Sequence, residues 1–151
     1  MINRKTFLIG TLAFALIALS IVLSRGIIRK TQLDTSSQVL ALDTIGALLK
    51  VRERQAMLLL MSDDNFDTKS KESSATILTN LTRAVGVLKT INSVTGSSEV
   101  PLLPLSRPPT ASYRFDLSML AGPITLTANL VWITGNWQFA NFSFSGDLLR
   151  N

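Results

Sequence analysis

The sequence predicts an α+β domain carried on an N-terminal transmembrane helix. Three observations lead to this fold class: an uncharged apolar run from Thr6 to Ser24, a helical stripe of apolar residues around Leu81, and an alternation of apolar and polar residues after Tyr113. We expect two helices packed on a C-terminal antiparallel sheet of three to four strands. The predicted segments are an anchor over residues 1–30, a polar joint over 31–37 and the domain over 38–151.

The apolar run Thr6–Ser24 holds nineteen residues without a charge. As a helix it would be about 28 Å long, close to the hydrocarbon thickness of a bilayer. A cleaved signal peptide is the alternative, but its apolar core is typically about 7–15 residues long, so we favour an uncleaved anchor. Basic residues flank both ends, so the positive-inside rule barely distinguishes the two orientations in the membrane. We choose the orientation with the short N-terminus inside, which places the domain on the extracytoplasmic, periplasmic side.

Two helices are predicted to open the domain. The first runs from about Gln38 to Met61. The second follows the polar break Ser62–Asp67, and its amphipathic stripe is made of Ile77, Leu78, Leu81, Ala84, Val85 and Leu88. Near Gly86 this helix should give way to a short extended segment. Residues 95–110 contain four of the five prolines and are expected to form a long irregular connection.

The C-terminal forty residues are predicted to form an antiparallel meander, and the hairpin around Gly135 allows two registers. A two-residue Gly–Asn loop would set Leu130 opposite Asn141. A three-residue loop would instead create the pairs Leu130 with Ala140, Ala128 with Phe142, and Leu126 with Phe144. Only the second register gives one continuous apolar face, so we predict the three-residue loop. We expect the helix bearing Ile77, Leu81 and Leu88 to cover that face.

Composition excludes several functions. The net charge is +5, but five basic residues flank the apolar run, and residues 31–151 hold ten basic and ten acidic side chains. A neutral domain gives no support for nucleic-acid binding, which depends on a basic surface. Cysteine and histidine are both absent, which removes disulfides, Cys/His zinc sites, haem ligation by histidine and any histidine base. We predict no cofactor.

One segment has a partial metal-binding pattern. Asp63, Asn65 and Asp67 match the first three ligand positions of a calcium loop. The match then fails, because Thr68 stands where the loop needs glycine and Ser74 stands where it needs a bidentate glutamate. A capped helix start explains these residues better, so we predict no metal site. The remaining carboxylates are scattered, and we nominate no catalytic acid or base.

Candidate partner contacts are found in two places. Trp132 and Trp137 flank the predicted hairpin turn, largely off the best core positions, where they either form a partner-binding edge or pack on the sheet surface. The proline-rich connection contributes Pro104, Arg107 and Pro108. These five residues are the candidate partner contacts that the sequence offers.

Two stretches carry a resemblance to a known superfamily. The segment Met61–Ser93 (MSDDNFDTKSKESSATILTNLTRAVGVLKTINS) resembles the front half of small nuclear-transport-factor-2-like, or cystatin-like cone, domains. The hairpin Ile124–Phe144 (ITLTANLVWITGNWQFANFSF) is similar to their final strands, with a Gly-x-Trp turn. The resemblance implies a curved sheet packed on helices. Enzymes of this superfamily use an acid/base dyad inside an apolar cone, and no residue here matches that dyad. Membrane-anchored members are similar in layout to subunits or assembly factors of envelope complexes.

These observations lead to one main expectation and two alternatives. We expect a non-enzymatic interaction or assembly module of an envelope complex, tethered to the lipid bilayer and bound to a protein of that complex. One alternative is a pilin-like structural subunit, although the chain lacks the glycine processing site followed by a glutamate. The other is a small-ligand-binding or enzymatic cone, which would show a deep apolar pocket with a buried carboxylate.

Overall fold

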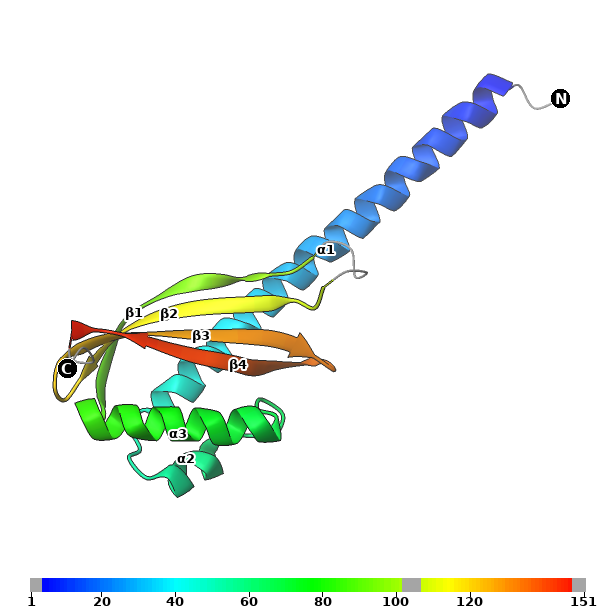
Figure 1. The fold of residues 1–151 in the computed structure, drawn as a ribbon. Helices are drawn as coiled ribbons and strands as arrows, with labels where there is room; N and C mark the ends of the chain where they lie inside the picture. Colours follow the sequence, from blue (N-terminus) through cyan, green and yellow to red (C-terminus); the bar gives the residue numbers. More distant parts are fainter. Residues whose placement is uncertain (1–3, 102–106, 148–151) are drawn as a thin grey trace.

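The computed structural model describes residues 4–101 and 107–147, with side chains described from residue 14 onward. Three helices precede and pack on a four-stranded antiparallel sheet, so the predicted α+β class is confirmed. Figure 1 shows one long helix leaving the domain, with its C-terminal part behind the sheet and two shorter helices along one side. The elements are α1 (Arg4–Leu48), α2 (Arg54–Leu60), α3 (Thr68–Val85), β1 (Leu88–Glu99), β2 (Thr110–Met119), β3 (Pro123–Ile133) and β4 (Asn136–Ser145).

Helix α1 is a single helix of 45 residues, and the predicted polar joint at 31–37 is helical throughout. The serine and threonine residues of this segment fit inside a helix because their hydroxyls bond backward to carbonyl oxygens one turn earlier. Thr31 donates to Ile27 O at 3.1 Å, and Ser37 donates to Asp34 O at 2.9 Å. Leu33 and Ser37 are already buried against the sheet, so the domain begins inside the segment that we predicted to be a joint.

The predicted first helix of the domain is broken in the structure. Helix α1 ends at Leu48, and the separate helix α2 begins at Arg54. Leu49 N donates to Ile45 O, whereas the next amides reach back only three residues, as in a tightened last turn. The carbonyl oxygen of Leu49 accepts a hydrogen bond of 2.9 Å from Leu88 N of β1, which attaches the end of α1 to the sheet. Periodicity alone did not reveal this tertiary contact.

Helix α3 agrees with its prediction and begins at a side-chain cap. Asp67 accepts hydrogen bonds at 2.8 Å from the amides of Lys69 and Ser70, which satisfies two amides that lack helical partners. Lys71 pairs with Asp63 at 2.7 Å. The residues that resemble a calcium loop therefore start a helix, and the described part of the chain contains no metal-binding group of three acidic, histidine or cysteine side chains.

The Asp67 cap should make stability depend on acid pH. The hydrogen bond from the Ser70 amide, the largest cause, together with that from Lys69, lowers the pKa of Asp67 below its ordinary value of 3.8. Because the pKa of Asp67 is lower in the folded state than in the unfolded state, the ionised carboxylate stabilises the fold fully above its ordinary pKa. This contribution is lost as the pH falls through the folded pKa. We expect Asp67→Asn, which keeps a capping oxygen, to unfold with a shallower dependence on pH below 4 in thermal scans. Equal acid dependence of both proteins would contradict this role.

The hairpin between β3 and β4 has the predicted register in its far half and a different register near the turn. The predicted pairs Leu126 with Phe144 and Ala128 with Phe142 are present. The three-residue loop is wrong, because Ile133 pairs with Asn136 across the two-residue turn Thr134–Gly135. Both turn residues have positive φ, as a tight hairpin turn requires. A β-bulge between Asn129 and Leu130 supplies the offset, so Leu130 pairs with Phe139 and Ala140 is exposed.

The core lies between the sheet and the helices, but α1 covers more of the sheet than predicted. Buried residues of α1, including Ala41 and Ile45, belong to the same core cluster as Tyr113 and Phe115 of β2. Helix α3 packs at the β4 side, and of the three residues predicted to cover the sheet, Ile77 is 39% exposed and Leu88 belongs to β1. The helix predicted to cover the face therefore covers only the part next to β4, and α1 covers the part next to β1 and β2.

Within the described residues, no helix combines the length, hydropathy and low charge that a membrane span requires. The predicted transmembrane segment is therefore not confirmed. The side chains of Thr6 to Ala13, the first part of that segment, lie outside the described ones.

Candidate functional site

One end of the sheet gathers the residues of the candidate site. Antiparallel pairing brings the last residue of β1, Glu99, beside Thr110 at the start of β2. The same pairing places the β3–β4 turn at this end. We call the region formed by Glu99, Thr110, the Trp132–Trp137 hairpin and the adjoining turn of α1 at Lys30 the sheet tip. In Figure 1 the sheet tip points to the same side as the N-terminal half of α1.

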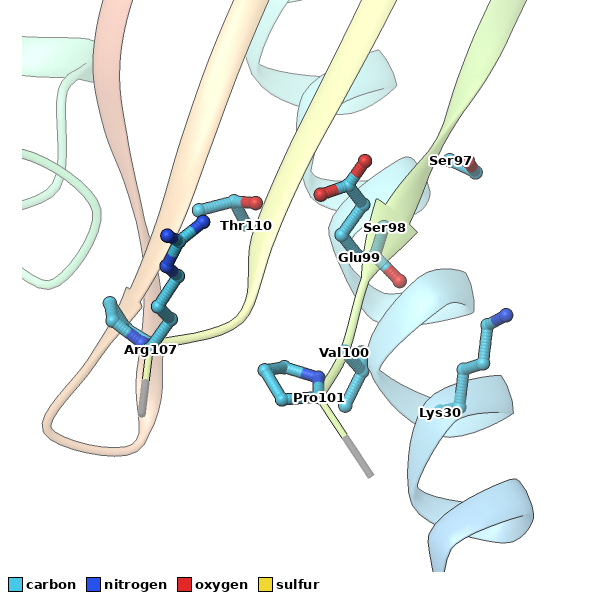
Figure 2. Close-up of a pocket in the computed structure, with 9 residues that line it drawn as sticks. Lys30, Ser97, Ser98, Glu99, Val100, Pro101, Arg107 and Thr110 are labelled. Atoms are coloured by element: carbon cyan, nitrogen blue, oxygen red, sulfur yellow. The ribbon is translucent and has the colours of Figure 1, made fainter. Parts of the chain in front are cut away.

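A hollow of about 620 Å³ opens at the sheet tip. Figure 2 shows Lys30 projecting from α1 on one side and Arg107, just before β2, on the other, with Glu99 between them. The described residues that line it are Lys30, Ser97, Ser98, Glu99, Val100, Pro101, Arg107, Pro108 and Thr110. Two cations and one carboxylate around the hollow favour an anion over a cation as its ligand.

Trp132 and Trp137 form a cross-strand pair at the sheet tip. Their ring centroids are 5.3 Å apart and their planes meet at 73°, an edge-to-face arrangement. Trp137 is only 3% exposed and donates its indole N–H to Ser36 Oγ at 3.1 Å. Trp132 is half-buried, and its amide donates to Pro109 O at 2.8 Å. The pair therefore connects the hairpin both to α1 and to the strand that leads away from Arg107.

A set of hydrogen bonds fastens α1 to the sheet tip. Tyr113 Oη shares a hydrogen bond of 2.7 Å with Ser37 Oγ and also donates to Asp34 O at 3.2 Å. Asp34 Oδ1 accepts from the amide of Ser98 at 2.7 Å. We call Asp34, Ser36, Ser37, Ser98, Tyr113 and Trp137 the helix clamp. Because its contacts reach β1, β2 and β4, the helix clamp holds the sheet tip in one position along α1.

Removing the Tyr113 hydroxyl should weaken the helix clamp. Tyr113→Phe deletes two hydrogen bonds to α1, and each such bond contributes about 0.5–1.5 kcal/mol net. We expect the free energy of unfolding in urea to fall by about 1–2 kcal/mol. Ser112→Ala, on the exposed face of the same strand, is the control and should stay within about 0.5 kcal/mol of the wild type.

Tyr113→Phe should also change how the stability of the fold depends on alkaline pH. Burial, the largest cause, raises the pKa of Tyr113 above its ordinary value of 10.0. The neutral hydroxyl therefore stabilises the fold below pH 10, and this contribution is lost as the pH rises through the folded pKa. Tyr113→Phe should lack this alkaline loss of stability. Parallel stability profiles above pH 10 would show that the pKa of Tyr113 is the same in the folded and unfolded states, which would contradict this expectation.

The structure brings most of the sequence-predicted contacts to the sheet tip. Arg107 and Pro108 are exposed beside the hollow, and Trp132 is half-buried nearby. Trp137 corrects the prediction, because it is a core residue and its side chain is covered. Pro104 lies outside the described residues.

Sequence reasoning missed Lys30, Glu99 and the serines of α1 as parts of this region. Lys30 had been assigned to the anchor flank, and the serines to a joint. The spacing of Leu33, Ser37, Ala41 and Ile45 by four residues was the available signal, since it marks one continuous helical face.

The outer face of the sheet carries a second hollow, of about 500 Å³. It is lined by Gly96, Ser97, Glu99, Thr110, Ala111, Ser112, Asn129, Leu130, Val131 and Ala140, so it shares three residues with the hollow at the sheet tip. The face around it carries Ser, Thr and Asn side chains together with the ion pair Arg114–Asp116. Asn129 donates to Asn141 Oδ1 at 2.6 Å across β3 and β4. Figure 1 shows the helices on the other side of the sheet, which leaves this face uncovered by them.

The hydrogen bonds of the described carboxylates indicate structural roles rather than acid–base catalysis. Asp34 is part of the helix clamp and Asp67 caps α3. Asp116 accepts from Ser93 at 2.7 Å and Thr125 at 3.1 Å, and these hydrogen bonds lower its pKa. A depressed pKa favours a permanently ionised carboxylate, which is a poor general acid. The described interior between α1 and the sheet is filled with side chains such as Tyr113 and Phe115.

Comparisons with known proteins give a fold likeness and no family. No protein-family model matches the chain, and a sequence search of curated proteins gives no match. A solved structure titled "Rd1NTF2_05_I64F_A80G_T94P_D101K_L106W" is similar with a TM-score of 0.40 and 8% identity. The alignment covers 74% of this chain and 98% of that chain. We draw no conclusion about function from a likeness of this degree. The architecture implied by the resemblance noted above, helices packed on an antiparallel sheet, is the one observed.

Proposed function

We propose that this chain is a membrane-tethered, non-enzymatic interaction module that holds a protein partner close to the bilayer surface. The observation that carries the proposal is the continuity of α1. The helix supplies buried residues of the domain core between Leu33 and Leu48, and it extends without a break toward the apolar N-terminal run.

The exposure of the free part of α1 supports a lipid environment for it. Its described large apolar side chains are all exposed and belong to no core cluster; they are Phe14, Leu16, Ile17, Leu19, Ile21, Val22, Leu23, Ile27 and Ile28. Exposed fractions range from 45% at Leu23 to 75% at Phe14. In water, an exposed apolar patch of this size would be a strong association site. Burial in hydrocarbon removes the free-energy cost of exposing these side chains to water. We place the domain on the extracytoplasmic side, as expected from the short N-terminal head.

The outer face of the sheet is the surface that we assign to the protein partner. No described helix covers it, and its neutral Ser, Thr and Asn side chains are suited to the polar, hydrated interfaces of non-obligate complexes. The helix clamp would keep this face at a constant height above the membrane. An envelope complex that assembles at the membrane is therefore the partner class that we propose.

Photo-crosslinking in native membranes tests this proposal. A photoreactive amino acid replaces Asn141, which is exposed beside the outer hollow, or Asn80, which is exposed on α3 and serves as the matched control. We expect one protein adduct of discrete mass from position 141 and none from position 80. The experiment is repeated with residues 1–30 replaced by an unrelated anchor.

The anchor replacement separates two ways in which the proposal could fail. If the adduct at position 141 persists after the replacement, the sheet recognises the partner and α1 is the tether. If the partner is lost with residues 1–30, those residues carry the contact and the assignment to the sheet is wrong. Equal labelling from positions 141 and 80 would contradict a specific interface.

A further inference from the structure

Two cations of the sheet tip come from separate parts of the chain and line one hollow. Lys30 comes from α1 and Arg107 from the segment before β2, 77 positions later in the sequence. We propose that the hollow between Lys30 and Arg107 binds the phosphate of an anionic phospholipid headgroup at the bilayer surface. This inference rests on the membrane tether of the proposed function and adds a second contact between domain and membrane.

The position of Lys30 along α1 matches the height of the headgroups. Lys30 follows Ser24, the last residue of the uncharged run, by six residues, which is about 9 Å of helix. The headgroup layer extends about 5–7 Å beyond the hydrocarbon core on each side. Since a lysine side chain can reach back toward the membrane, the hollow lies at the outer limit of the headgroup layer.

The electrostatics of the hollow suit an anionic ligand. Lys30 and Arg107 are exposed, and within the described residues neither lies within 4 Å of a carboxylate. Among the described lining residues Glu99 is the one acidic side chain, and the carboxylate of Asp34, one turn after Lys30, accepts from the Ser98 amide beside the hollow. Arg25 and Arg29, both exposed on the preceding turn of α1, add positive charge on the membrane side. Juxtamembrane basic residues of this kind are attracted to anionic lipid surfaces.

The helix clamp fixes one wall of the hollow before a lipid binds. Asp34, one turn after Lys30, accepts from the Ser98 amide, and Ser98 itself lines the hollow. The strand end that carries Glu99 is therefore fixed to α1 at this height. The tryptophan pair lies at the same end of the sheet, and tryptophan is enriched at membrane–water interfaces. A preformed site loses less conformational entropy when it binds.

The two tryptophans are the only ones in the chain, so they report on lipids near the sheet tip. The full chain is reconstituted into phosphatidylcholine nanodiscs with a small fraction of fluorescent acceptor lipid. The acceptor is either phosphatidylglycerol or phosphatidylcholine with the same labelled acyl chain. Energy transfer from Trp132 and Trp137 should be greater to labelled phosphatidylglycerol at equal mole fraction, and the excess should fall as salt is raised.

Charge reversal assigns the preference to the hollow. We expect Arg107→Glu to lower the preference for phosphatidylglycerol at least about fivefold, since the loss of one basic residue near an anionic surface alone accounts for about that factor. Lys30→Glu should have a similar effect. Lys89→Glu is the matched control, because Lys89 is exposed at the opposite end of β1 and should leave the preference unchanged.

The outcomes separate this inference from the proposed function. Resistance to alkaline carbonate extraction reports whether the chain is inserted at all. Inserted protein with equal transfer to both labelled lipids would overturn headgroup binding while leaving the tether intact. A preference that persists in Arg107→Glu would also overturn it, because the flanking arginines of α1 would then be its cause. Complete extraction by carbonate would overturn both.

Discussion

Replacing Phe139 with alanine is expected to lower the free energy of unfolding by about 3–5 kcal/mol, the usual cost of removing a buried aromatic ring. Phe139 is 2% exposed and stacks on Phe66 with centroids 4.9 Å apart. It also contacts Phe142, at 5.2 Å. The ring thus joins β4 to the segment between α2 and α3. Since single domains are stable by about 5–15 kcal/mol, much of the population would unfold under mild denaturant.

Urea unfolding of the full chain in a mild detergent, followed by far-ultraviolet circular dichroism, measures this loss. Leu59→Ala is the control, because Leu59 is 84% exposed on α2 and its removal should change stability by no more than about 0.5 kcal/mol. A loss below about 1 kcal/mol for Phe139→Ala, the range of a surface change, would show that β4 does not pack on the helices as described.

Gly96→Ala is the second substitution with a large expected effect. Gly96 has φ +137°, and a Cβ atom added there would lie 2.0 Å from the carbonyl oxygen of Ser112 on β2. The unfavourable backbone conformation alone costs about 1–3 kcal/mol, and relieving the collision requires β1 to move away from β2. Tyr113, the register partner of Gly96, belongs to the helix clamp. The same change should therefore loosen the attachment of α1.

Gly135→Ala separates the collision from the backbone strain. Gly135 also has positive φ, but an added Cβ would meet nothing within 4 Å. We expect a clearly lower melting temperature for Gly96→Ala than for Gly135→Ala, measured by circular dichroism in the same detergent. Equal melting temperatures would mean that the close approach of β1 and β2 at Gly96 is not present in solution.

The sequence was most informative where one pattern had one structural solution. Alternation from Tyr113 onward required strands with a buried face, and the polar break with a capping aspartate required a helix to begin after Asp67. The far half of the β3–β4 register followed from the need to pair Ala128 with Phe142 and Leu126 with Phe144. Near the turn, however, the two-residue loop and the bulge together satisfy the same requirement, and hydrophobicity does not distinguish them.

Tertiary contacts decided the features that the sequence did not reveal. Residues 31–37 are polar, and the sequence predicts a joint there. They are helical because their hydroxyls form hydrogen bonds within α1 and, at Ser37, with Tyr113 of the sheet. The sequence predicts Trp137 off the best core positions, either at a partner-binding edge or packed on the sheet surface. In the structure it is buried and donates a hydrogen bond to Ser36, a helical residue 101 positions away. The sheet-tip hollow likewise requires Lys30 and Arg107 to meet through folding, although Arg107 and Pro108 were already candidate contacts.

The most direct test of the account is a cysteine scan of α1 from Val22 to Gln38 with nitroxide spin labels, in the full chain reconstituted in liposomes. The native chain has no cysteine, so each label has one attachment site. We predict low mobility and unbroken helical periodicity through residues 31–37, with oxygen collisions dominant up to Ser24 and a water-soluble relaxant dominant beyond Lys30 on the exposed face. Mobile, non-periodic labels at 31–37, or equal access of the water-soluble relaxant before and after Ser24, would contradict a domain held rigidly at the membrane surface.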